Sequence, residues 1–420
     1  MWHKQLLANK ARLLTIPMTG TKALTALALF PIGSRYEKNS QSGLSHFIEH
    51  MLFKGTPTRP TTLDLSRELD RVGAEYNAYT SRDHTGYYIK VNAEKTELAL
   101  DLLSDMIWNS KFEAAEIEKE KGVIVEELNM YQDNPTMYLD QLFEETMFGK
   151  HSLGQDIGGR PETVKKFHRR ELWDFYQSFY QPSNLVLILA GQISPATIKL
   201  ARKYFGSPTG KSSRLVFSRF NPQTLAGVKT RVKFKETDQA HLALGFPAFS
   251  YDDPRSISLA LLNLILGGTM SSRLFIEVRE RRGLAYAIQS GVNHYQEVGN
   301  LAIEAGLDKT RLVESVQVIL AELEKLKKDG VTGDELKWAK ENFKGRFVLS
   351  CENSNFQADW YGKQALLMKE IETPEQKLKK LRAVSVGDIQ KVAQQVFDRR
   401  KLKMAIIGPF KNEGELKKML

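Results

Sequence analysis

The stretch TALALFPIGSRYE, residues 25–37, begins with an apolar run and ends in a Phe-Pro pair and a polar turn. The stretch HLALGFPAFSYDD, residues 241–253, has the same form, with Phe-Pro at 246–247 instead of 30–31. Short apolar runs bounded by turn residues are typical of buried strands. The pattern therefore predicts a strand leading into a turn in each half of the chain, repeated at a period of about 210 residues.

Further pairs of segments follow these two strands in the same order. The pairs are Gly55-Thr56 with Gly268-Thr269, GAEYNAYTS (73–81) with GLAYAIQS (283–290), ELALDLLSDMIW (97–108) with RLVESVQVILAELEKLKK (311–328), and EAAEIEKEKGVIVEEL (113–128) with GDELKWAKENFKGRF (333–347). The last two pairs have the apolar spacing of amphipathic helices. The repeat predicts an α+β fold of two homologous domains, each a mainly antiparallel sheet flanked by helices.

A connecting segment separates the two halves. Residues 206–230, GSPTGKSSRLVFSRFNPQTLAGVKT, are rich in Gly, Pro, Ser and Thr. Such composition is typical of a linker. We therefore expect an N-terminal domain at 1–205 and a C-terminal domain at 231–420.

Composition narrows the class of protein. The 420 residues are 42% hydrophobic and 26% charged, which is ordinary for a globular protein. Cys351 is the only cysteine, which excludes an intramolecular disulfide and a cysteine metal cluster. No apolar run approaches the ~20 residues of a membrane span, and the N-terminus lacks a signal-peptide pattern, so we expect a cytoplasmic protein without a membrane partner. The net charge of +10 comes from Lys and Arg interleaved with Glu, which favours solvated helix faces over nucleic-acid binding.

The five residues HFIEH, at 46–50, have the spacing of a metal site. On a helix, His46 and His50 are four apart and stand on one face, where both can reach one Zn²⁺. Glu49 shares that face and is a candidate catalytic base, whereas Phe47 and Ile48 point elsewhere and are expected to be buried. The alternative is a solvated helix with two incidental histidines, so the hypothesis needs a third ligand.

The helical segment EKEKGVIVEEL, residues 118–128, is the best source of that ligand. Three apolar residues mark its predicted buried side: Val123, Ile124 and Leu128. Glu120 and Glu127 are seven apart and lie on one face, and Glu127 adjoins this buried side. Glu126 is rotated by about 100° and is expected to be solvated, but the pattern does not exclude it as the ligand. The second half has apolar residues, SLALLNLIL (258–266), at the position of HFIEH, so only the first half is equipped to bind a metal.

Four stretches together resemble the pitrilysin-like, or inverzincin, zinc metallopeptidases. They are similar above all to the β-type subunit of mitochondrial processing peptidase and its short prokaryotic relatives. The stretches are GLSHFIEHMLFKGT (43–56), GAEYNAYTSRDHTGYY (73–88), EKEKGVIVEELNMYQDNP (118–135) and LGGTMSSRLFIEVRERRGLAYAI (266–288). They occur in the family's order, and the resemblance covers essentially the whole chain.

This resemblance implies one Zn²⁺ per chain in an N-terminal catalytic domain. The implied ligands are His46, His50 and Glu127. The implied general base is Glu49, and Glu120 is implied to orient the metal site from behind the ligands. Two imidazoles and a carboxylate also admit Mn²⁺ or Co²⁺, so zinc follows from family habit.

The resemblance also implies substrate-binding residues in both halves. Arg279 and Tyr286 match a pair that faces the bound peptide, and either is a candidate to stabilise the negative charge that develops on the peptide carbonyl oxygen. Asn77 and Ala78 match a substrate-contacting strand. Residues 77–91 have the composition of an exposed edge strand, to which an extended peptide can add through main-chain hydrogen bonds. The pattern fits an ordinary internal strand equally well, and the match of Asn77 and Ala78 favours the edge strand.

The expected function is that of a zinc-dependent endopeptidase acting on extended or unfolded peptides. Because Arg279 and Tyr286 lie in the chain's own second half, we expect a homodimer of self-sufficient chains. The alternatives are an active subunit that needs a different, related chain in a heterodimer, and a non-catalytic structural subunit of the same fold.

Overall fold

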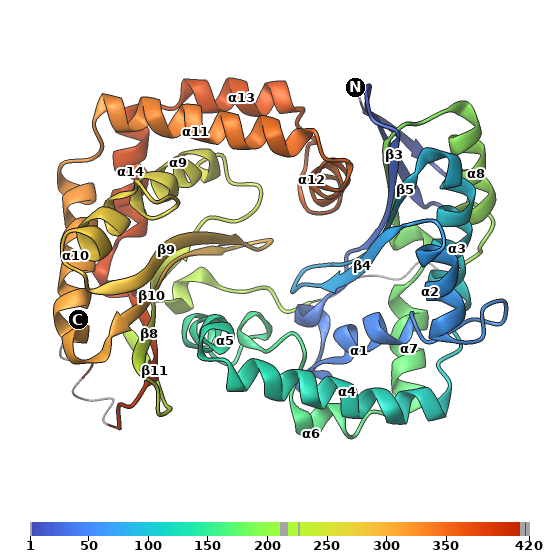
Figure 1. The fold of residues 1–420 in the computed structure, drawn as a ribbon, viewed down its shortest axis with the longest axis horizontal. Helices are drawn as coiled ribbons and strands as arrows, with labels where there is room; N and C mark the ends of the chain where they lie inside the picture. The colour runs from blue at the N-terminus through green and yellow to red at the C-terminus, as the bar shows by residue number, and fades with distance from the viewer. Residues whose placement is uncertain (1, 211–216, 226, 412–415, 417–420) are drawn as a thin grey trace. The chain divides into compact units, whose positions relative to one another are not determined.

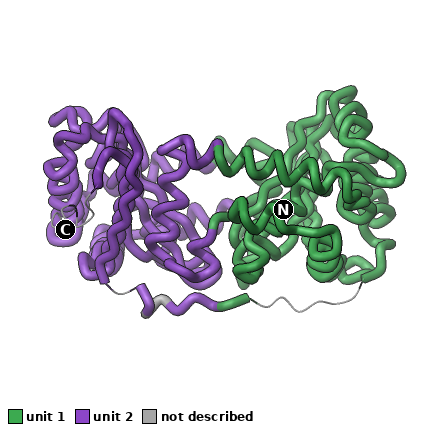
Figure 2. The backbone as a smooth tube through the Cα atoms, turned by 90° about the horizontal axis from the view of Figure 1, so that it is seen from below, with its two compact units in different colours: residues 1–129, 156–218, 348–373 green, residues 130–155, 219–347, 374–420 purple. Residues whose placement is uncertain are grey.

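The computed structural model describes the chain except for residues 1, 211–216, 226, 412–415 and 417–420. The described chain forms two compact units, each assembled from three segments. Unit 1 contains residues 1–129, 156–218 and 348–373, and unit 2 contains residues 130–155, 219–347 and 374–420 (Figure 2).

A six-stranded sheet forms the centre of unit 1, with the order β1-β2-β6-β3-β5-β4. Its strands are β1 (His3–Leu6), β2 (Arg12–Pro17), β3 (Ala23–Phe30), β4 (Glu75–Thr80), β5 (Thr85–Asn92) and β6 (Val186–Gly191). Only the β2–β6 pair in this sheet is parallel. Strand β4 is therefore at one edge of a mainly antiparallel sheet.

Unit 2 contains a five-stranded sheet with the order β7-β11-β8-β10-β9. Its strands are β7 (Lys229–Phe234), β8 (Gln239–Ala248), β9 (Ala285–His294), β10 (Gly299–Asp308) and β11 (Lys403–Gly408). The β7–β11 pair is parallel and the other pairs are antiparallel. This order repeats that of β2-β6-β3-β5-β4, so the predicted α+β fold with two similar, mainly antiparallel sheets is confirmed.

The apolar run of β3 has a simple cause. Ala26, Ala28 and Phe30 belong to one hydrophobic core, whereas Leu27 and Leu29 belong to a second core on the other face of the sheet. Successive side chains of a strand point to opposite faces. A strand covered on both faces therefore has no polar alternation, which explains why ALTALALF is apolar throughout.

Helices cover both faces of each sheet. Those that lie wholly in unit 1 are α1 (Leu44–Met51), α2 (Thr62–Asp70), α3 (Thr96–Asn109), α6 (Pro161–Val164), α7 (Arg169–Phe179), α8 (Pro195–Phe205) and α12 (Ser354–Leu367). Those that lie wholly in unit 2 are α5 (Pro135–Phe148), α9 (Ser256–Leu266), α10 (Leu312–Lys328), α13 (Pro374–Ala383) and α14 (Val386–Val396). The boundary between the units falls within α4 (Ala114–Asp133) and α11 (Gly333–Cys351).

Each sheet receives one helix from the other half of the chain. In unit 1, α12 packs on β3 and β6 on the side opposite α3 and α8 (Figure 1). In unit 2, α5 packs on β8 and β11 on the side opposite α10 and α14. The units therefore differ from the continuous ranges 1–205 and 231–420, because amphipathic spacing shows that a helix is half-buried without showing which sheet it covers. The predicted linker, 206–230, contains the boundary between residues 218 and 219, and its residues 211–216 and 226 lie outside the described part of the chain.

Candidate metal centre

Helix α1 buries one side and presents its polar side chains on the other. Phe47 and Ile48 have no exposed surface, as predicted from their spacing. His46, Glu49 and His50 are each half-buried. A helix in which two histidines share a half-exposed face supplies imidazole nitrogens that remain accessible to an ion.

The start of α1 is held by the buried carboxyl group of Glu37. Glu37 accepts hydrogen bonds from the backbone N–H groups of Gly43, at 2.8 Å, and Ser45, at 2.6 Å. Burial raises the pKa of Glu37 to about 8. Gly43 has φ of +96°, and a Cβ there would lie 2.5 Å from the carbonyl oxygen of Gly158. Only glycine fits this left-handed turn against a second backbone, so the turn fixes where α1 begins.

Helix α4 turns a glutamate-bearing side towards the core. Ile124 and Leu128 are buried as predicted, and Glu120 is only 3% exposed. These three residues are spaced by four and form one stripe. The prediction that Val123 is buried is wrong: it is 51% exposed, because it lies one position beside that stripe.

Three ligand atoms meet between α1 and α4. The Nε2 atoms of His46 and His50 are 3.3 Å apart. Oε2 of Glu127 lies 3.8 Å from Nε2 of His46 and 3.5 Å from Nε2 of His50. Glu127 is half-buried, whereas Glu126 is exposed. Among the described residues, these three form the one group of three or more His, Cys, Asp or Glu side chains that could hold a metal ion.

The donor set and its spacing fit zinc. Tetrahedral Zn²⁺ with bonds of about 2.0–2.2 Å to nitrogen and oxygen requires ligand atoms about 3.4 Å apart, close to the three separations found here. Burial and the neighbouring His50 lower the pKa of His46 to about 3. His46 is therefore neutral near pH 7 and can offer a lone pair, as a metal ligand must.

Glu120 lies behind the three ligand atoms. Its Oε1 is 2.8 Å from Nδ1 of His50, and its Oε2 is 2.5 Å from Nζ of Lys54. Burial opposes ionisation of Glu120, but the hydrogen bonds from His50 and Lys54 outweigh it and lower its pKa. When this carboxylate accepts a hydrogen bond from the Nδ1–H group of His50, the lone pair of the ring is on Nε2. That atom faces Glu127 and His46.

Glu49 is linked to the edge strand of the sheet. Its Oε2 accepts a hydrogen bond of 2.5 Å from Oγ1 of Thr80, the last residue of β4. Burial raises the pKa of Glu49, and the hydrogen bond from Thr80 opposes that rise. Glu49 is thus a carboxylate of increased basicity with a fixed orientation, as a general base requires.

Strand β4 carries Asn77 and Ala78 at an edge of its sheet. Asn77 is exposed, and its Oδ1 accepts the N–H of Ala78 at 2.9 Å. The prediction of a single edge strand over 77–91 is wrong in its second part. Residues 85–91 belong to β5, which pairs with β4 on one side and β3 on the other. The turn at 81–84 between the strands was not recognised in the sequence.

Arg279 and Tyr286 lie together in unit 2. Arg279 belongs to a π-helix, η7 (Phe275–Glu280), and Tyr286 to β9. The guanidinium carbon of Arg279 is 4.7 Å from the ring centre of Phe275 and 5.7 Å from that of Tyr286. Tyr286 is 76% exposed. An exposed aromatic ring beside a cation is suited to binding a ligand, and single π-helical turns recur at functional sites.

Sequence reasoning missed two residues of this region. Lys54 is four residues after His50, so helical spacing could have placed the two side chains near each other. Thr80 follows Ala78 by two residues, so strand alternation could have placed both on the same face. Neither position carries a motif that identifies its partner.

Comparison with known proteins places both halves of the chain in one family. A sequence profile described as "Insulinase (Peptidase family M16)" matches residues 14–160, and one described as "Peptidase M16 inactive domain" matches residues 166–343. The first range contains HFIEH and Glu127. The second contains α9, where the first half has its histidines.

Curated relatives span nearly the full length. An "uncharacterized zinc protease YmxG" of Bacillus subtilis is 38% identical over 382 residues, which cover 90% of this chain and 91% of that protein. An uncharacterized zinc protease of Streptomyces coelicolor is 32% identical over 407 residues, with 96% and 88% covered.

Solved structures share the fold. A protease from Helicobacter pylori matches with a TM-score of 0.92 at 23% identity, over 97% of this chain and 99% of that one. A peptidase M16 inactive domain from Pseudomonas fluorescens matches with a TM-score of 0.90 at 19% identity, over 98% of this chain and 99% of that one.

Among the helices of the described residues, none has the length and the apolar composition that a membrane span requires.

Proposed function

The chain belongs to the pitrilysin-like peptidases, family M16, and we propose that it is a zinc-dependent endopeptidase acting on extended or unfolded peptides. The observation that carries this proposal is that one ligand atom each of His46, His50 and Glu127 lies within 4.8 Å of the other two, so the three could hold one ion. Glu49 adds a carboxylate of raised pKa on the same helix as both histidines. The relatives' names support zinc as the metal.

The three ligands hold one zinc ion per chain in this proposal. When bound, zinc would lower the pKa of a coordinated water to about 7 and polarise the peptide carbonyl. The neutral imidazoles contribute Nε2 lone pairs, and Glu127 contributes a negative charge. Glu120 keeps the Nδ1 proton of His50 in place, which preserves the tautomer that the site needs.

Glu49 moves the proton during hydrolysis. Thr80 holds Oε2, which leaves Oε1 to take a proton from the attacking water. The protonated carboxyl then gives this proton to the leaving amine nitrogen as the peptide bond breaks. The raised pKa of Glu49 favours both steps, because it brings the group closer to working pH.

The peptide binds as an additional strand on β4. The outer edge of β4 is not part of the sheet ladder, since β5 pairs with its other side. Main-chain hydrogen bonding there requires an extended substrate and reads little of its sequence. Asn77 and Ala78 are the proposed edge contacts. Arg279 and Tyr286 are proposed to bind the peptide, and either could donate to the carbonyl oxygen that becomes negative.

The test is cleavage of an unstructured, internally quenched peptide by the full-length, zinc-loaded chain. We expect cleavage that is lost with a chelator and in Glu49→Gln, while Glu49→Gln still binds one zinc. Glu126→Gln is the matched control, because it makes the same chemical change at an exposed position of α4 and should keep both zinc and activity.

Cleavage that persists in Glu49→Gln would contradict the proposed base. Stoichiometric zinc without cleavage in the wild type would contradict a self-sufficient chain and favour the requirement for a second, related subunit.

A further inference from the structure

A buried carboxylate connects Lys54 to the proposed metal ligand His50. Oε2 of Glu120 is 2.5 Å from Nζ of Lys54, and Oε1 is 2.8 Å from Nδ1 of His50. The side chain of Glu120 is 4% exposed and that of Lys54 is 22% exposed. One carboxylate therefore spans a cation and an imidazole, with little solvent to replace either partner.

The backbone of Lys54 is held from both directions. Its N–H donates to the carbonyl of Met51, the last residue of α1, at 3.1 Å. The next residue, Gly55, has φ of +107°, and a Cβ there would lie 2.3 Å from the carbonyl oxygen of Pro60. This close approach ties the segment after Lys54 to the turn at residues 56–60.

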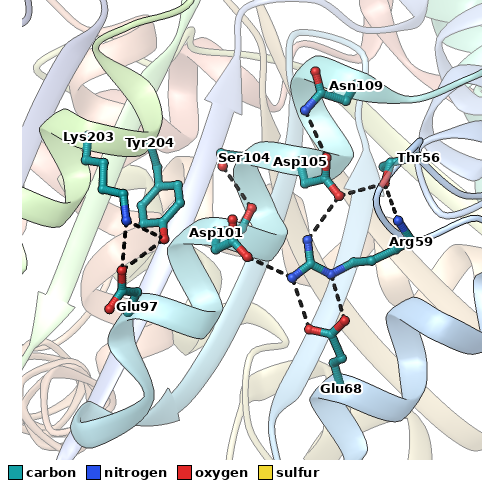
Figure 3. A network of polar contacts seen from close by, with 10 residues as sticks. All are labelled: Thr56, Arg59, Glu68, Glu97, Asp101, Ser104, Asp105, Asn109, Lys203 and Tyr204. Carbon is teal, nitrogen blue, oxygen red and sulfur yellow. Dashed lines mark hydrogen bonds and ion pairs between the residues drawn. The ribbon is translucent and has the colours of Figure 1, made fainter.

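A polar network anchors that turn to two helices (Figure 3). Thr56 donates to Asp105 at 2.6 Å, and Arg59 donates to the same carboxylate oxygen at 3.0 Å. Arg59 also donates to Glu68 of α2, at 3.0 Å, and to Asp101 of α3, at 2.7 Å. The backbone of Lys54 therefore lies between two fixed segments, the end of α1 and the turn that this network anchors.

We propose that Lys54 is a positioning residue of the metal site. Its ammonium group holds the Glu120 carboxylate in the orientation that accepts a hydrogen bond from the Nδ1–H group of His50. That hydrogen bond directs Nε2 of His50 towards the metal. The ammonium group of Lys54 pairs with Glu120, so in this proposal Lys54 acts through Glu120 and is not itself a ligand. The inference rests on the proposed function, in which His46, His50 and Glu127 bind zinc.

The test compares the zinc affinity of Lys54→Met and Lys119→Met, measured by competition with a chromophoric chelator. Lys119 is the matched control: it directly precedes Glu120 in α4, but its side chain is 70% exposed and pairs with Glu116 at 2.6 Å. We expect a roughly 10- to 100-fold loss of zinc affinity in Lys54→Met, the usual effect of disturbing a ligand's hydrogen-bond partner. Lys119→Met should stay within about twofold of the wild type.

Two measurements separate positioning from a general loss of structure. The metal-free Lys54→Met chain should keep the unfolding midpoint of Lys119→Met to within a few degrees. With Co²⁺ in the site, its visible absorption spectrum should change, because the orientation of His50 changes. Lys54→Arg, which keeps a charged donor, should recover part of the affinity.

A double substitution tests whether Lys54 acts through Glu120. Lys54→Met combined with Glu120→Gln should weaken zinc binding no more than the stronger single change, because both act through one carboxylate. Fully additive losses would overturn the inference, as would wild-type affinity in Lys54→Met. A wild-type chain that binds no zinc would instead overturn the proposed function, and a Glu127→Gln chain that binds it normally would overturn the proposed ligand set.

Discussion

Thr80 donates a hydrogen bond from Oγ1 to Oε2 of Glu49 at 2.5 Å, and this contact joins the edge strand β4 to the metal helix α1. The residue that orients the proposed base thus lies on the strand proposed to bind the peptide. A shift of β4 would move Thr80 and so change the orientation of the Glu49 carboxylate. Substrate binding and proton transfer therefore depend on the same strand.

Replacing Thr80 with Val should lower kcat about 10-fold and leave KM within about twofold. The shape of the side chain is nearly kept, but Glu49 loses the donor that orients it for proton transfer. Steady-state kinetics with the quenched peptide measure both constants. Thr80→Ser keeps the hydroxyl and should retain most of the rate, and a large rise in KM with unchanged kcat would contradict this role.

Glu127→Gln should abolish stoichiometric zinc binding near pH 7. An amide oxygen replaces the carboxylate that lies 3.5 and 3.8 Å from the two imidazole nitrogens, and the negative charge is lost. Metal content after gel filtration, together with a competition titration, measures the effect. Glu126→Gln should keep one zinc per chain, and the reverse pattern would transfer the ligand role to Glu126.

His84 should make stability depend on pH. Burial, and then the charge of Lys363, lower the pKa of His84 to about 4, whereas an unfolded histidine has a pKa of about 6.5. The unfolded state therefore binds more protons between these values. The stabilisation from keeping His84 neutral is complete above about pH 6.5 and falls by roughly 3 kcal/mol as the pH drops towards 4.

The measurement is the free energy of unfolding of the metal-free chain against pH, for the wild type and His84→Gln. Other groups titrate alike in both chains, so the difference isolates His84. The variant should be less stable at pH 7, because the contact of 2.9 Å between Oγ of Ser81 and Nδ1 of His84 is lost, and its stability should fall less steeply below pH 6.5. If the free energy of unfolding changed with pH in the same way in both chains, His84 would not be the source of the pH dependence.

Arg59→Met should destabilise the chain by about 2–4 kcal/mol. The change leaves Asp105, whose side chain is 6% exposed, without its charged partner, and burial of an unpaired charge is costly. The more exposed carboxylates of Glu68 and Asp101 should add little. Urea unfolding measures the loss. Arg311→Met, which breaks an exposed pair with Glu314, should leave the free energy of unfolding nearly unchanged, and equal costs for both variants would refute the importance of the network.

Local spacing in the sequence was enough for much of the fold and the site. The four-residue separation of His46 and His50 places them on one helical face whatever surrounds the helix. The repeated strand and helix patterns likewise predicted two similar sheets, whose matching strand orders confirm the prediction. Glu120 and Glu127 were placed on one side of α4 by their separation of seven residues.

The remaining features depend on contacts between segments far apart in the chain. Whether Glu126 or Glu127 meets the histidines depends on how α4 rotates against α1, and Val123 shows that an apolar residue beside the buried stripe can face solvent. Lys54 and Thr80 have no motif, because their partners are 66 and 31 residues away. The exchange of α5 and α12 between the halves has the same origin.

The helices and strands, their repeat and the side chains that share a helix face follow from backbone geometry over a few residues, so they can be predicted from the amino-acid pattern. Packing in three dimensions selects which sheet α5 and α12 cover, which glutamate meets His46 and His50, and which groups hold Glu49 and Glu120. Those choices are made by burial and by pairing of charges in a packed interior, where the partner of each group is set by the whole fold.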